Sequence, residues 1–204
     1  RLLTEVYPKG ILSVVSDTWD FWKVIMEYLP AIKDAIMARD GKLVIRPDSG
    51  DPVKIIVGDE NSDVPHVRAG AIECLWNIFG GTLTKKKYKI LDSHIGLIYG
   101  DSITIERQKA ILEGLKKKGF ASTNVVLGIG SFTYQYVTRD TYGFAMKSTW
   151  GQTKSLGGVA IFKDPKTDEN AAKKSHRGLL SVYRGRDGQL KCLQDCTREQ
   201  EQQG

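Results

Sequence analysis

The stretch Leu43-Val-Ile-Arg-Pro-Asp-Ser-Gly50 decides how this chain is interpreted, because an apolar run ends there in charged and small residues. The three residues before Arg46 have the apolar, partly β-branched character of a buried strand. Pro47 has no amide N–H to donate to a strand ladder, so the strand should end there. Arg46 and Asp48 would then lie at the carboxyl end of the strand, where ligands bind in α/β folds.

Three other apolar runs end in a similar way. They are Ile11–Ser16 before Asp17-Thr18, Ile95–Tyr99 before Gly100-Asp101-Ser102, and Val125–Leu127 before Gly128-Ile-Gly-Ser131. Glycines let a phosphate approach the backbone, and Asp, Ser or Thr can cap a helix or bind ribose hydroxyls and metal-bound water. Any one of these ends could be an ordinary turn with a helix cap. Taken together, the four ends predict one site for an anionic, sugar-bearing ligand.

The composition is typical of a globular protein without a membrane segment. The chain has 204 residues, of which 41% are hydrophobic and 26% are charged, which is enough for one core or slightly more. It contains no apolar run of about 18 residues and no signal-peptide pattern, so we expect no membrane partner and no secretion. The net charge of +6 would favour a polyphosphate substrate. The lysine clusters lack a nucleic-acid motif, so we expect no nucleic-acid partner.

The cysteines and the chain ends lead to two further expectations. Cys74, Cys192 and Cys196 are an odd number and lack the other ligands of a zinc site, so a reducing, cytoplasmic setting is expected. The chain begins with Arg1 and ends in polar residues. We therefore expect it to be a piece of a longer protein.

Helical and strand patterns alternate over the first part of the chain. Apolar residues recur at intervals of three and four over 21–36, 67–79 and 104–119, which predicts helices. The first should bend at Pro30 and stop at Gly41, and the second should close at Gly80-Gly81. A helical turn is expected at 53–57 and a short edge strand at 87–91. This alternation predicts an α/β fold with a mostly parallel sheet.

The pattern changes beyond Tyr142. Short strands are predicted at 144–150, 159–162, 179–183 and 189–193, with no long helix between them. We therefore divide the chain into an α/β portion that carries the site, residues 1–142, and a β-rich extension, residues 143–204.

Several motifs, in their order and spacing, carry a family resemblance over nearly the whole chain. They are Ser13–Thr18, Ile45–Gly50, Gly96–Ser102, Gly128–Ser131, Thr138–Asp140 and Phe162–Pro165. Together they resemble the carboxyl-terminal half of the nicotinamide phosphoribosyltransferase family. The resemblance implies part of an irregular type II phosphoribosyltransferase α/β barrel, with ligands at the carboxyl ends of the strands and an added mixed domain.

The resemblance also implies a reaction. Nicotinamide would be joined to the ribose of phosphoribosyl pyrophosphate, giving nicotinamide mononucleotide and pyrophosphate in NAD salvage, with Mg²⁺ required and ATP as a coupled activator. The ribose carbon becomes cation-like as pyrophosphate leaves. Such a reaction needs positive groups on the leaving group and an acid near the sugar.

The resemblance assigns roles to residues at the first two strand ends. Arg46 resembles the family arginine that binds the diphosphate or the 5′-phosphate, a task that suits a planar bidentate donor. Asp48 matches the acid beside the ribose. Asp17 matches a second acid near the sugar or the hydrated metal, so Mg²⁺ is expected to be held through pyrophosphate and water, with no direct protein ligand assigned.

Further roles follow at the later motifs. Gly100 and Asp101 correspond to the turn that binds ribose and phosphate. Gly130 and Ser131 correspond to the backbone cradle for the 5′-phosphate. Ser131 stands where glycine is commoner in the family. Serine is compatible with this position if its backbone N–H binds the phosphate.

Two basic residues point to a homodimer. Arg139 and Lys147 resemble residues that reach the neighbouring subunit's phosphate site, so sites shared across the interface are expected. A surface salt bridge of Arg139 with Asp140 or with another surface acid is the alternative interpretation.

Residues of the nicotinamide side of the site are not found in the motifs. The family's phosphorylated histidine and ring-stacking aromatic residue precede the first strand predicted here, and His66, His94 and His176 match no family motif. We therefore expect the isolated fragment to be inactive and to bind nucleotide weakly. The open alternatives are nicotinate phosphoribosyltransferase and a noncatalytic nucleotide-binding module.

Overall fold

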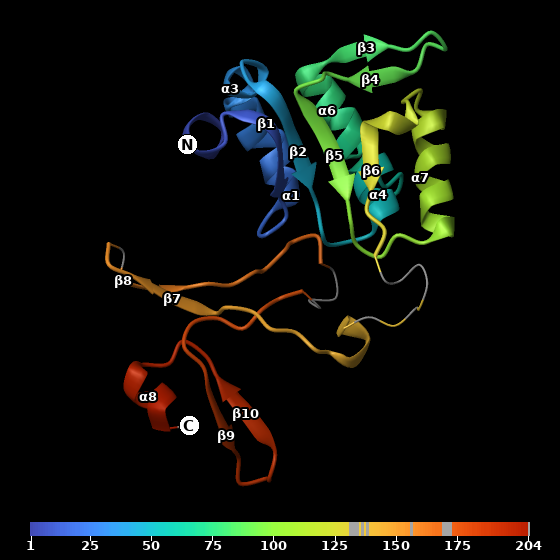
Figure 1. Cartoon of the computed structure of the whole chain (residues 1–204). Coiled ribbons are helices and arrows are strands. Elements are labelled where there is room, and N and C mark those ends of the chain that lie inside the picture. Colours follow the sequence, from blue (N-terminus) through green and yellow to red (C-terminus); the bar gives the residue numbers. More distant parts are fainter. Residues whose placement is uncertain (131–134, 136, 138, 156, 169–172, 204) are drawn as a thin grey trace. The chain divides into compact units, whose positions relative to one another are not determined.

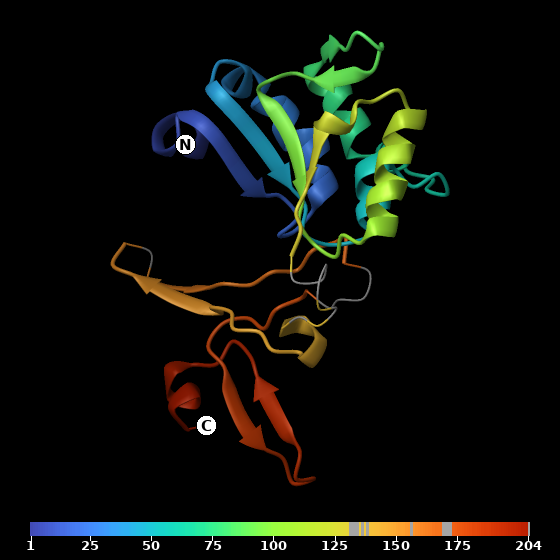
Figure 2. The same cartoon turned by 45° about the vertical axis from the view of Figure 1, so that its right-hand side comes forward.

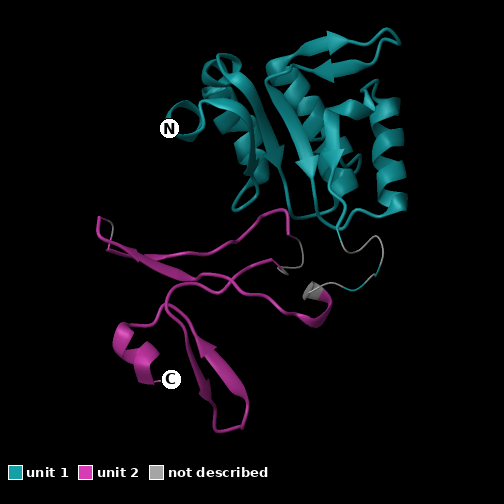
Figure 3. Cartoon of the chain, viewed as in Figure 1, with its two compact units in different colours: residues 1–138 teal, residues 139–204 magenta. Residues whose placement is uncertain are grey.

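The computed structural model describes residues 1–130, 135, 137, 139–155, 157–168 and 173–203. Contacts divide the chain into two compact units, Arg1–Thr138 and Arg139–Gly204 (Figure 3). The domain boundary between residues 142 and 143 stays a prediction, close to the division between these units.

The first unit contains a four-stranded sheet in the order β1-β2-β5-β6. Its strands are β1 (Lys9–Val15), β2 (Asp40–Arg46), β5 (Ile95–Tyr99) and β6 (Val125–Leu127). Each neighbouring pair is parallel, so the carboxyl ends of the strands lie at one edge (Figure 1). The predicted α/β class with a parallel sheet is confirmed.

Helices cover one face of this sheet. Figures 1 and 2 show α4, α6 and α7 on the same side of the strands. The helical segments before the second strand are η1 (Leu2–Val6), α1 (Phe21–Lys23), η2 (Val24–Tyr28), α2 (Leu29–Ala31) and α3 (Lys33–Met37). Those after it are α4 (Pro52–Val57), α5 (Pro65–Ala69), α6 (Ala71–Phe79), α7 (Ile105–Lys117) and η3 (Ser122–Asn124).

The strand register divides the side chains between the two faces of the sheet. Leu43 pairs with Ile95, and Ile45 pairs with Leu97. All four are buried among the helices. Because side chains alternate along a strand, Arg46 at the end of β2 belongs to the opposite face. The helix-covered face holds the core, and the other face carries the first predicted site residue.

Glycines explain two departures from the predicted helices. The first helix was expected to stop at Gly41, and this is wrong: α3 ends at Met37 and Gly41 lies inside β2. A Cβ on Gly41 would lie 2.1 Å from the carbonyl oxygen of Gly10, so this glycine permits close packing of β1 against β2. The second predicted helix is two helices that meet at Gly70, which has a φ of 82°. A Cβ there would lie 2.3 Å from the carbonyl carbon of Val57.

The other predictions for this unit agree more closely with the structure. The first predicted helix is interrupted at Ile32, two residues after Pro30, because Ile32 has a non-helical φ of −115°. Thr104 caps α7 by accepting the amide N–H of Arg107. The edge strand expected at 87–91 is β4 (Lys89–Leu91), which forms an antiparallel hairpin with β3 (Gly81–Leu83).

The second unit is rich in short strands, as expected. β7 (Trp150–Thr153) pairs with β8 (Gly157–Ala160), and β9 (Ser181–Arg184) pairs with β10 (Leu190–Leu193), both antiparallel. Of the strand predicted at 144–150, only Trp150 lies in a strand, as the first residue of β7. Two helical segments, η5 (Arg139–Tyr142) and α8 (Arg198–Gln203), complete the unit. Helix α8 was not predicted, because its sequence is polar and has no apolar residues recurring at helical intervals.

Among the described residues, no helix is both long enough and apolar enough to cross a membrane.

Candidate functional site

A buried carboxylate organises the carboxyl edge of the sheet. Asp17 follows β1 and is fully buried. Its Oδ2 accepts the amide N–H of Asp48 at 2.8 Å and also the hydroxyl of Ser49. Its Oδ1 is buried and has no hydrogen-bond partner among the described residues. The end of β1 therefore holds the loop after β2, and one carboxylate oxygen remains for a further interaction.

Arg46 lies beside Asp48 without being neutralised by it. The nearest guanidinium nitrogen is 4.0 Å from Asp48 Oδ1, and the two side chains are 43% and 32% exposed. A partly exposed pair at this distance is weak. Arg46 Nε is buried and has no hydrogen-bond partner within the described part of the chain. The guanidinium therefore keeps donor capacity for an anion.

Gly100 leaves the backbone without a side chain next to this arginine, and Gly128 packs closely against Gly100. A Cβ on Gly100 would lie 3.5 Å from a guanidinium nitrogen of Arg46, and a Cβ on Gly128 would lie 2.8 Å from the Gly100 Cα. Gly128 also donates its N–H to the carbonyl of Tyr99 at 2.8 Å. Backbone without side chains beside a guanidinium suits a phosphate group. Gly128 has no predicted role of its own, although its place directly after β6 was the available signal.

Tyr99 supports the same loop from the helix-covered face. Its side chain is fully buried, and its hydroxyl lies 2.8 Å from the carbonyl oxygen of Ser49 and 2.9 Å from that of Gly50. Burial raises the pKa of this hydroxyl, and the nearby Asp101, Asp17 and Asp48 charges raise the pKa further. Tyr99 is therefore a hydrogen-bond donor at neutral pH.

The structure brings most of the predicted residues of the first unit together. Asp17, Arg46, Asp48 and Gly100 are joined by the contacts above, and Asp101 lies near enough to act on Tyr99. Gly130 is exposed after the end of β6.

The remaining predicted residues are not joined to this group. Ser131 lies outside the described residues. Arg139 begins η5, but its side chain also lies outside the described part. Lys147 is exposed in the second unit.

Comparisons with known proteins show the family of this chain. The family model described as "Nicotinate phosphoribosyltransferase (NAPRTase) family" matches residues 6–202. The chain belongs to this phosphoribosyltransferase family. The sequence is similar to a nicotinamide phosphoribosyltransferase of Acinetobacter baylyi, with 53% identity over 100% of this chain and 41% of the relative. It is similar to a Mycoplasma pneumoniae protein of the same name, with 44% identity over 90% of this chain and 42% of the relative.

The resemblance found in the motifs is thereby confirmed. The chain spans about two fifths of the length of the curated relatives it matches.

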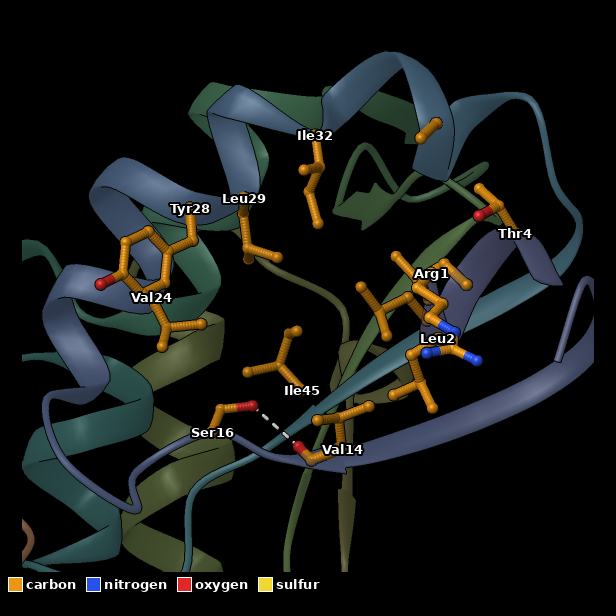
Figure 4. A pocket seen from close by; sticks show the side chains of 13 residues that line it. Arg1, Leu2, Thr4, Val14, Ser16, Val24, Tyr28, Leu29, Ile32 and Ile45 are labelled. Atoms are coloured by element: carbon orange, nitrogen blue, oxygen red, sulfur yellow. Dashed lines mark hydrogen bonds between the residues drawn. The ribbon is translucent and has the colours of Figure 1, made fainter. Parts of the chain in front are cut away.

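The chain also has an apolar pocket on the helix-covered face, beside β1 and β2 (Figure 4). Its volume is about 310 Å³. Val14, Ile45, Leu29 and other apolar side chains line it, and Arg1 is the only charged residue among the lining residues. Because its lining is mostly apolar, this pocket does not fit a phosphate or a ribose. Arg46 and Asp48 are not among its lining residues.

Two histidines of the chain, His66 and His94, lie beside residues outside the candidate site. The ring of His66 lies 5.5 Å from that of Trp22. His94 Nδ1 lies 2.7 Å from Asp92 Oδ1, before the amino end of β5. Neither pair contains a residue of the candidate site.

Proposed function

We propose that this chain supplies the phosphate-and-ribose part of the site of a nicotinamide phosphoribosyltransferase. The observation that carries the proposal is the placement of Arg46 against Gly100, with Asp17 holding the Asp48 loop at the shared carboxyl edge. The names of the relatives support nicotinamide as the acceptor. The whole protein would convert nicotinamide and phosphoribosyl pyrophosphate into nicotinamide mononucleotide and pyrophosphate.

The chemistry explains why these residue types would be used. A bond forms between the pyridine nitrogen of nicotinamide and ribose C1, and the bond from C1 to the pyrophosphate oxygen breaks. Arg46 would bind phosphate oxygens, either on the departing pyrophosphate or at the 5′ position, where a fixed positive charge stabilises the negative charge. The Asp48 carboxylate would lie beside the cation-like sugar. Asp17, through its hydrogen bond to the Asp48 amide, would fix that carboxylate's position.

Magnesium fits this proposal as a substrate-bound ion. The described residues contain no cluster of three or more acidic, histidine or cysteine side chains arranged to hold a metal. Mg²⁺ usually keeps several waters and is bound through one or two carboxylates and substrate phosphates. Asp17 Oδ1 and the Asp48 carboxylate offer oxygens of the right kind, and the ion would neutralise pyrophosphate charge. ATP as a coupled activator belongs to the same proposal, on family membership alone.

Further parts of the proposal concern assembly and location. We propose a homodimer in which Arg139 and Lys147 reach the partner's phosphate site, supported by the family resemblance of their motifs. Light scattering of the complete protein would contradict this if it showed a monomer.

A cytoplasmic location is supported by three cysteines that form no disulfide.

Calorimetric titration of the 204-residue chain with nicotinamide mononucleotide tests the assignment of Arg46. We expect Arg46→Ala to weaken binding by about tenfold or more, because a charge-assisted hydrogen bond contributes about 1.5–3 kcal/mol. Arg68→Ala is the matched control, since Arg68 is an exposed arginine on α5. Equal affinities for the wild type and Arg46→Ala would contradict the assignment.

A second candidate substrate is nicotinate, which the description of the matching family favours. Competition between nicotinamide and nicotinate, measured on the complete protein, separates the two. Preferential use of nicotinate would overturn the nicotinamide assignment while leaving the phosphate-and-ribose site in place.

A further inference from the structure

Tyr99 is a buried polar residue for which the reaction described above has no role. Its ring belongs to the helix-covered face of β5, in register with Leu127 of β6. Arg46 belongs to the opposite face, next to Gly100. A ligand beside Arg46 would therefore meet the backbone of β5 and not the Tyr99 side chain.

The hydroxyl of Tyr99 nevertheless reaches the loop that carries Asp48. It lies within 2.9 Å of two successive carbonyl oxygens, those of Ser49 and Gly50. A phenol has one proton to donate, so these two carbonyls share it or exchange it. Either arrangement restricts the peptide that follows Asp48.

The same loop is restricted from the other side by Asp17. Its Oδ2 accepts the Asp48 N–H and the Ser49 hydroxyl. Asp17 therefore binds the loop from just after β1, and Tyr99 binds it from the last residue of β5. These two anchors, one at Asp48 and one directly after it, fix the backbone from which the Asp48 side chain projects.

We propose that Tyr99 is a positioning residue, whose hydroxyl holds the Ser49–Gly50 backbone so that Asp48 is preorganised for the ribose of the nucleotide. Its functional consequence rests on the proposed function. The hydrogen bonds themselves are independent of any ligand. A site whose first contacts are held by a second set of hydrogen bonds loses less conformational freedom on binding.

Tyr99→Phe tests this proposal because it removes only the hydroxyl and keeps the ring in the core. Ile111→Val is the matched control: Ile111 is fully buried in α7, and its shortening costs about as much stability as a lost hydrogen bond. Amide hydrogen exchange of the unliganded 204-residue chain gives the first measurement. We expect exchange at residues 48–51 to quicken by about threefold to tenfold in Tyr99→Phe, as for a lost bond of about 0.5–1.5 kcal/mol, and not in Ile111→Val.

Titration with nicotinamide mononucleotide gives the second measurement. We expect Tyr99→Phe to weaken binding by about threefold to tenfold. In an Asp48→Ala background the same change should alter affinity by less than about twofold, because residues that act through one another are not additive. A purely structural contribution would instead produce the same loss in both backgrounds.

The outcomes separate this proposal from the proposed function. Unchanged exchange at residues 48–51 in Tyr99→Phe would overturn the positioning role, as would a variant that loses its fold. Additive losses in the two backgrounds would also overturn it. If the wild type showed no binding but the exchange difference were present, the proposed function of this chain would fail while the anchoring of the loop would stand.

Discussion

Gly128 sets how closely the ends of β5 and β6 approach each other. A Cβ added there would lie 2.8 Å from the Cα of Gly100, which is backbone and cannot rotate away. At Gly130 an added Cβ would meet no atom of the described residues within 4 Å. These two glycines of one motif therefore have different structural requirements, although the sequence pattern treats them alike.

We expect Gly128→Ala to lower the free energy of unfolding by about 1–3 kcal/mol, the usual cost of forcing atoms into a packed site. Binding of nicotinamide mononucleotide should weaken as well, because the strand end beside Arg46 must shift. Urea unfolding and calorimetric titration measure the two effects. Gly130→Ala is the control for stability and should leave the unfolding midpoint unchanged; equal effects of the two substitutions would contradict this explanation.

At the scale of the elements, helix α4 begins directly after the candidate site. Asp51 caps it by accepting the amide N–H groups of Val53 at 2.8 Å and Lys54 at 3.3 Å. Pro52 occupies the first turn, where its missing N–H costs nothing. The loop that carries Asp48 thus ends in a well-defined helix start.

Replacing this cap should destabilise the first unit. We expect Asp51→Ala to cost about 0.5–2 kcal/mol of unfolding free energy, the usual range for an N-cap aspartate. Asp51→Asn keeps the capping oxygen and should cost much less. Denaturant unfolding of the three proteins provides the comparison, and equal losses for Ala and Asn would show that charge, not capping, matters at this position.

The molecule as a whole should lose stability at alkaline pH, because burial keeps the Cys74 thiol and the Tyr99 hydroxyl protonated in the folded chain. Burial raises the pKa of Cys74 from 9.0 to about 11, and burial likewise raises the pKa of Tyr99 above its usual value of 10.0. Above these usual values the unfolded chain releases both protons while the folded chain still holds them. The free energy of unfolding is therefore fully retained below about pH 9 and falls as the pH rises further.

We expect a loss of up to about 1.4 kcal/mol per pH unit for each group in this range. Denaturant unfolding under reducing conditions at pH 8, 9, 10 and 11 would show it. Cys74→Ala should remove the part of the slope that begins near pH 9, whereas Cys192→Ala, which changes an exposed cysteine, should not. Identical slopes for the two variants would contradict the role of Cys74.

The sequence by itself determined the α/β class, the β-rich second part and the strand ends at which Asp17, Arg46, Asp48 and Gly100 lie. These follow from local signals, because apolar periodicity, proline and acidic turn residues act within a few positions along the chain. Two glycines depart from the prediction in opposite ways: Gly41, predicted as a helix stop, lies inside β2, and Gly70, predicted within a helix, separates α5 from α6. At both positions a neighbouring backbone occupies the space that the missing Cβ leaves, and the sequence alone does not show this.

The tertiary structure decided how the strand ends cooperate. The hydrogen bonds of Asp17 to the Asp48 loop, the two carbonyls held by Tyr99 and the close approach of Gly128 to Gly100 join residues at the ends of different strands. Such contacts depend on strand order and register, which bring distant residues together and which no local pattern encodes. Sequence therefore predicted the residues of the candidate site, and packing between strands gave them their arrangement.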